Sequence, residues 1–110
     1  MILSKPVDIE DFSGCVHKNF GVFMVKLVAD LQREILAYDA EWHADLESEL
    51  LADGSEQKNL WGFNYYLDTD TLEYNSLINI RPMENRSADI LNPDICTRVE
   101  SVFRMWVRYA

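Results

Sequence analysis

The alternation of apolar and polar positions along the chain predicts a sheet of four β-strands. In each of four segments nearly every second side chain is apolar, which is the period of a strand with one buried face. The first two segments are joined by a short turn and so are the last two, so each pair must be antiparallel. The predicted strands span residues 22–30, 35–42, 60–67 and 74–81.

A period of three to four residues predicts three helices around these strands. The clearest helix starts with Asn92 as its cap and Pro93 at its first position, and an apolar stripe follows as far as Tyr109. A shorter helix is expected over 43–52, and another after Asp8. The apolar stripe of that first helix would consist of Ile9, Phe12, Val16 and Phe20.

These elements follow one another in the order α-β-β-α-β-β-α. We therefore expect an α+β fold, in which a four-stranded antiparallel sheet carries its helices packed on one face. A chain of 110 residues is long enough for one core, so residues 1–110 are expected to form a single domain.

Two of the predicted strands contain asparagine and arginine, which are rare inside sheets. If the loop between these strands has four residues, 69–72, then Asn64 lies on the same face as Asn79 and Arg81. The opposite face would carry Trp61, Phe63 and Ile78.

This polar group suggests a ligand site. A guanidinium binds carboxylates and phosphates through paired hydrogen bonds, and Arg81 and Arg86 flank a loop that begins with a proline. The leading hypothesis is a binding module for a small polar or anionic ligand, or for a protein partner. The residues concerned are Asn64, Asn79, Arg81, Asn85 and Arg86. In the competing structural interpretation, Arg81 forms an ion pair and the asparagines cross-link backbone groups.

A second hypothesis, from a different class, is a small hydrolase. His43 could act as a general base or hold a metal ion, with Asp45 or Glu41 beside it. However, residues two apart on a helix do not face each other, and no second histidine lies nearby. We therefore predict neither a metal site nor a cofactor, and whether the chain is an enzyme stays open. A third hypothesis is a structural domain that forms a homodimer through an apolar helix stripe.

The charge of the chain limits the classes of partner that we expect it to bind. There are 19 acidic and 10 basic residues, which gives a formal net charge of −9. This balance argues against nucleic acid and against an anionic membrane surface as partners. No apolar run approaches the ~20 residues of a membrane span. The N-terminal segment does not follow the signal-peptide pattern, so a cytoplasmic location is expected.

Several short motifs resemble a family of small prokaryotic proteins of unknown function. They are Glu41-Trp-His-Ala-Asp45, Asp53-Gly-Ser-x-Gln57, Leu60-Trp-Gly-x-Asn64, Ser76-Leu-Ile-Asn-Ile-Arg-Pro82 and Asn85-Arg-Ser87. The resemblance extends from about Gly21 to the last helix, and its most specific parts are Leu-Trp-Gly and Asn-Ile-Arg-Pro. It implies a stand-alone cytosolic domain and transfers no catalytic residue.

Overall fold

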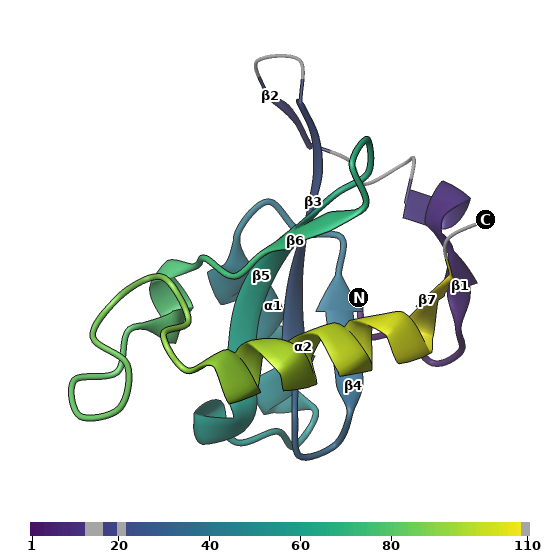
Figure 1. Cartoon of the computed structure of the whole chain (residues 1–110). Helices are drawn as coiled ribbons and strands as arrows, with labels where there is room; N and C mark the ends of the chain where they lie inside the picture. The colour runs from purple at the N-terminus through teal and green to yellow at the C-terminus, as the bar shows by residue number, and fades with distance from the viewer. Residues whose placement is uncertain (13–16, 20–21, 109–110) are drawn as a thin grey trace.

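The centre of the molecule is an antiparallel β-sheet, as the computed structural model in Figure 1 shows. Its central strand β3 (Val22–Asp30) pairs along one edge with β5 (Leu60–Tyr66). Along its other edge it pairs first with the short strand β2 (His17–Asn19) and then with β4 (Ile35–Tyr38). The outer edge of β5 pairs with β6 (Thr71–Glu73). The structure describes residues 1–12, 17–19 and 22–108.

The remaining elements lie around this sheet. A short parallel pair, β1 (Val7–Asp8) and β7 (Val107–Arg108), joins segments that are far apart in the sequence. The two α-helices of the described residues are α1 (His43–Ala52) and α2 (Pro93–Trp106). Three short 3₁₀ helices, η1 to η3, span Ile9–Phe12, Gln57–Asn59 and Leu77–Asn79. No helix in this part of the chain is long and apolar enough to cross a membrane.

The predicted α+β class and the antiparallel sheet are confirmed. The helix α2 begins as the sequence indicates, since Asp94 N donates a hydrogen bond of 2.9 Å to Asn92 Oδ1 and Pro93 lies in the first turn. Its apolar stripe is buried in the core through Val99 and Phe103. The chain itself therefore covers this stripe.

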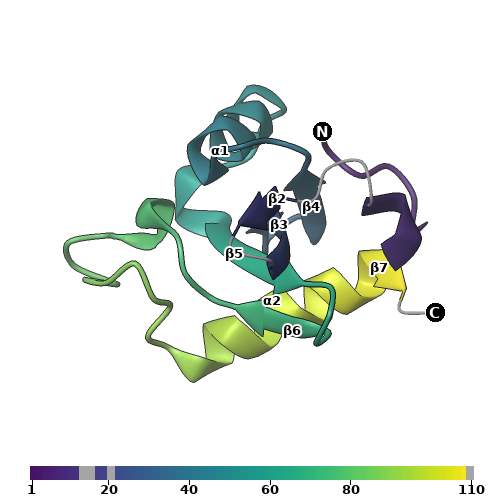
Figure 2. The same ribbon diagram turned by 90° about the horizontal axis from the view of Figure 1, so that it is seen from above.

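The two α-helices cover opposite faces of the sheet (Figure 2). Helix α2 packs on the face that carries Leu27 and Phe63, while Leu46 and Leu50 of α1 pack on the other face against Val28. The prediction that the helices share one face is wrong. The second half of the central strand is apolar on both sides, and each apolar face has to be covered.

The first predicted helix is replaced by two shorter elements. The 3₁₀ helix η1 and the strand β2 occupy the described parts of this segment, while Val16 and Phe20 lie outside the described residues. Phe12 is fully buried, and its ring centroid lies 5.3 Å from that of Tyr38. A single turn is thus enough to bring this side chain into the core. Gly14 within the segment also disfavours a long helix.

The fourth strand is shorter than predicted and lies earlier in the chain. Strand β6 ends at Glu73, and the segment after it leads into η3. In place of a strand, Asn79 completes the edge of β5: Gly62 N donates to Asn79 Oδ1 at 2.8 Å, and Asn79 Nδ2 donates to Gly62 O at 2.9 Å. A neighbouring strand would supply the same two bonds. The predicted strand 74–81 is therefore wrong, because a side chain takes its place.

The pairing of Gly62 with Asn79 requires that position 62 carries no side chain. A Cβ atom built on Gly62 would lie 2.6 Å from Ser76 Cβ and 2.7 Å from Ser76 Oγ. Non-bonded atoms do not pack at such distances, so a larger residue would push the segment with Ser76 and Asn79 away from β5.

Replacing Gly62 with alanine should therefore lower the free energy of unfolding by about 1–3 kcal/mol, the usual cost of overpacking. Urea unfolding followed by tryptophan fluorescence measures this change. The matched control is Gly54→Ala, where nothing lies within 4 Å of the added Cβ and only the φ of +105° causes strain. A Gly62→Ala protein as stable as the wild type would contradict the proposed close contact.

Candidate functional site

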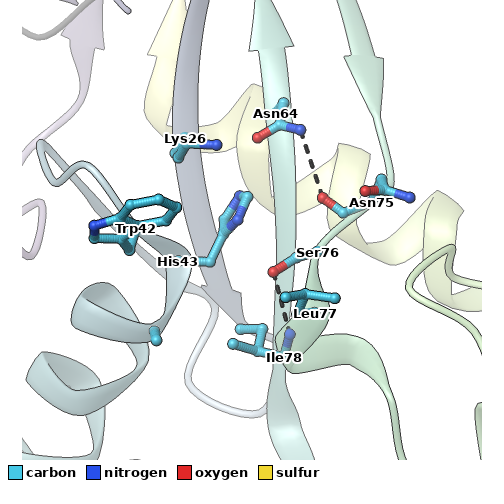
Figure 3. Close-up of a pocket in the computed structure, with 9 residues that line it drawn as sticks. Lys26, Trp42, His43, Asn64, Asn75, Ser76, Leu77 and Ile78 are labelled. Carbon is cyan, nitrogen blue, oxygen red and sulfur yellow. Dashed lines mark hydrogen bonds between the residues drawn. The ribbon is translucent and has the colours of Figure 1, made fainter.

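A cavity of about 240 Å³ lies between the start of α1, the strands β3 and β5, and the segment after β6 (Figure 3). It brings together His43 and Asn64, which the sequence assigned to two different hypotheses. It adds residues that the sequence reasoning did not select, among them Lys26 and Trp42. The part of the cavity with convergent polar groups is formed by Lys26, His43 and Asn64.

The pairing of β3 with β5 places two of these groups side by side. Lys26 and Asn64 are direct partners in the antiparallel register, so their side chains stand next to each other on one face. This face is covered by α1, whereas the alternate residues Phe63 and Tyr65 point into the core under α2. The first residue of α1, His43, then lies beside them (Figure 3).

The side chain of Asn64 is only partly satisfied within the protein. It is 5% exposed, and its Nδ2 donates to Glu73 Oε1 at 2.9 Å and to Asn75 O at 3.5 Å. Its Oδ1 is buried and has no hydrogen-bond partner among the described residues. Figure 3 shows this oxygen turned toward the side of Lys26 and His43. A buried amide oxygen without a donor costs about 1–3 kcal/mol, so this atom favours any donor that enters the cavity.

The imidazole of His43 is held in its neutral form. Its Nε2 lies 2.9 Å from Phe63 O, and since a carbonyl oxygen only accepts, the ring proton lies on Nε2. Burial lowers the pKa of His43, and the nearby ammonium of Lys26 lowers it further. Hydrogen bonds that the protonated ring would donate to the Phe63 carbonyl and to the Asn64 side chain act in the opposite direction. The carboxylate that acts on this pKa is that of Glu73.

The residues that change the pKa of His43 are therefore not the partners predicted from the sequence. Neither Asp45 nor Glu41 lines the cavity, and both side chains are exposed. Within residues 1–12, 17–19 and 22–108, no three His, Cys, Asp or Glu side chains form a group that could hold a metal ion. The chemistry available to His43 in this structure is thus that of a lone neutral imidazole at a cavity wall.

Two features of the cavity favour an anion. The ammonium of Lys26 forms no ion pair or hydrogen bond with any other described residue. Helix α1 begins at the cavity with Trp42 in the N-cap position, and the Trp42 side chain makes no capping hydrogen bond to the first turn. The free backbone N–H groups and the helix dipole favour an anion at this end. Asp45, in the first turn, offsets part of this charge.

The other predicted ligand-binding asparagines have partners within the protein. Asn79 holds Gly62, as described above, and also donates to Ala88 O at 3.1 Å. Asn85 Nδ2 donates to three carbonyl oxygens, and its Oδ1 accepts from Leu91 N at 3.0 Å. Both amides are buried, so their observed role is to fix the loop between β6 and α2.

The two arginines also contact the protein itself. Arg81 lies 3.7 Å above the centre of the Trp61 ring, and it donates to the carbonyls of Gln57, Lys58 and Leu60. Arg86 is exposed and donates to Pro82 O at 3.0 Å. The expectation that Asn64, Asn79 and Arg81 share one sheet face is wrong, because residues 77–79 form a 3₁₀ helix rather than a strand.

The neutral state of His43 gives stability a definite dependence on pH. Its pKa in the folded protein lies below the ordinary value of about 6.5 that the unfolded chain has. Above the pKa that His43 has in the unfolded chain, the neutral ring contributes fully to the stability of the folded protein. This stability is lost as the pH falls from that value through the lower pKa of His43 in the folded protein. An NMR titration of the ring resonances, assigned by their loss in His43→Gln, should show a midpoint below 6.5. A midpoint at or above that of the denatured protein would contradict the geometry.

Comparison with known proteins gives a family but no activity. The family described as "Protein of unknown function (DUF5674)" matches residues 1–106. No curated protein and no solved structure matches the chain. The resemblance noted in the sequence motifs is confirmed at this level. The chain belongs to the DUF5674 family of proteins of unknown function.

Proposed function

We propose that this protein is a binding module for a small anionic ligand, which occupies the cavity at the start of α1. The observation that carries the proposal is the buried Asn64 Oδ1, which faces the cavity without a partner among the described residues. Buried amide groups are normally paired, and those that are not need a reason. A ligand that donates to this oxygen supplies that reason.

The charges around the cavity support an anion. An ammonium that is half-buried without a carboxylate partner favours a negatively charged ligand. Lys26 is half-buried and has no such partner among the described residues, and it shares the cavity with the start of α1. An ammonium and a helix N-terminus that converge on one space form a common type of anion site.

The polar residues of the following loop have a supporting role in this proposal. Asn79, Arg81 and Asn85 hold the segment that supplies Ser76, Leu77 and Ile78 to the cavity wall. Direct contact of these residues, or of Arg86, with a ligand stays a prediction. A small molecule fits better than a protein partner, because the unpaired oxygen is buried within a space of about 240 Å³.

The proposal is tested by titrating acetate, benzoate and inorganic phosphate separately into ¹⁵N-labelled protein. We expect the carboxylates to shift the amide resonances of His43, Ala44 and Asn64 in a saturable manner. Replacing Lys26 with methionine should weaken benzoate binding by about tenfold or more, because a charge-assisted hydrogen bond is lost. The matched control is Lys58→Met, since Lys58 is exposed and pairs with Glu56 at 3.3 Å.

Two results would contradict this function. One is the absence of saturable shifts at the cavity with any of the three anions. The other is an equal loss of affinity in the Lys26→Met and Lys58→Met proteins, which would show that only the overall charge matters.

A small hydrolase is a second candidate function, and one observation favours it. The neutral imidazole of His43 lines the cavity, and this is the form that a general base requires. On this alternative, His43→Gln should slow the hydrolysis of p-nitrophenyl acetate or p-nitrophenyl phosphate by about a hundredfold or more. The other histidine in the chain offers the matched control, His17→Gln. Turnover that is absent, or equal in the two variants, removes the alternative.

A further inference from the structure

We infer that the ligand of this cavity is a small planar carboxylate that carries an N–H donor next to its anionic group. This inference rests on the function proposed above and specifies the class of ligand. It follows from three properties of the cavity: a fixed acceptor, a nearby cation and an exposed aromatic ring at its rim.

The acceptor is fixed because the side-chain amide of Asn64 cannot flip. Its Nδ2 already faces two acceptors, the Glu73 carboxylate and the Asn75 carbonyl. A flipped amide would place Oδ1 against both of these oxygens and would lose two hydrogen bonds. The atom that faces the cavity is therefore the oxygen, and a ligand has to bring the donor.

The anionic group has to lie close to that donor. Lys26 and Asn64 are direct cross-strand partners, and such residues have Cβ atoms about 5 Å apart. A ligand that reaches both groups can therefore be small, with its N–H and its negative charge on neighbouring atoms. An α-N–H carboxylate has this arrangement.

A carboxylate suits the local charge better than a phosphate. Lys26 provides one ammonium, while Glu73 lies near enough to act on the pKa of His43 and Asp45 stands in the first turn of α1. A dianion would meet repulsion from these two carboxylates, whereas a monoanion is balanced by the single ammonium.

The planar shape follows from the rim of the cavity. The side chain of Trp42 is 63% exposed and that of Leu77 is 80% exposed, yet both line the cavity. Figure 3 shows the indole beside the space between Lys26 and His43. A flat ring that stacks on this indole gains apolar burial without filling a deep pocket.

The experiment compares three probes of the same shape by NMR titration of the full chain. Pyrrole-2-carboxylate has both the N–H and the charge; furan-2-carboxylate lacks the N–H; pyrrole-2-carboxamide lacks the charge. We expect pyrrole-2-carboxylate to bind at least about tenfold more tightly than either analogue, since each analogue loses one of the two polar contacts. Inorganic phosphate should bind more weakly than pyrrole-2-carboxylate.

Variants locate the source of this preference. Asn64→Leu should abolish the preference for pyrrole-2-carboxylate over furan-2-carboxylate, while Asn75→Ala should retain it because the Asn75 side chain bonds to Asp89. Trp42→Ala should weaken the binding of pyrrole-2-carboxylate but leave the binding of acetate unchanged. If Asn64→Leu does not fold, the three probes on the wild-type protein still decide the question.

The outcomes separate this inference from the proposed function. Equal binding of furan-2-carboxylate and pyrrole-2-carboxylate, with saturable shifts at the cavity, overturns the N–H requirement and leaves the anion site standing. Tighter binding of inorganic phosphate overturns the carboxylate class in the same way. No binding of any anion overturns both.

Discussion

The pairing of one asparagine side chain with the edge of a strand is the constraint on which the rest of this structure depends. Strand β6 is too short to cover the whole edge of β5, and at Gly62 the backbone N–H and C=O are left without a strand partner. Buried backbone groups in that state are costly. Asn79 satisfies both with one amide, so the segment that follows β6 is anchored to the sheet without being part of it.

The anchored loop explains why neighbouring polar residues are buried. The amide of Asn85 binds the carbonyl of Asn79, and Arg81 stacks on Trp61 while it holds the turn before β5. Each of these contacts fixes the same loop from another side. Asn64 differs from Asn79 and Asn85 in one respect: its oxygen has no partner among the described residues. Asn79 and Asn85 therefore have a structural role, whereas the amide of Asn64 lies at a cavity.

The sequence predicted the elements whose signals are local. Helix α2 has its cap, its proline and its stripe within a short stretch, and they are read correctly as far as Trp106, while Tyr109 lies outside the described residues. The alternation over 74–81 wrongly indicated a strand. The Asn79 side chain bonds to β5 in place of a strand, and the periodicity of the sequence does not indicate such a contact. The second covered face was missed because only a few apolar side chains define it, such as Val28 on β3 and Leu60 on β5.

The candidate site was predicted only in pieces for a related reason. His43 and Asn64 were both selected, but no pattern in the sequence connects them, since their proximity depends on how α1 crosses the sheet. Lys26 becomes significant only once the register places it opposite Asn64. Pairing between distant strands is a property of the whole fold.

A bound carboxylate would change the protonation state that the cavity favours for His43. Burial and the ammonium of Lys26 disfavour the imidazolium, so the pKa of His43 lies below its ordinary value. A bound carboxylate would neutralise the field of Lys26 and favour the imidazolium. Linkage then requires that protonation of His43 strengthens carboxylate binding by the same factor by which binding favours protonation. As the pH falls, His43 lowers the stability of the folded protein. Under the same conditions it would raise the affinity of the cavity for an anion.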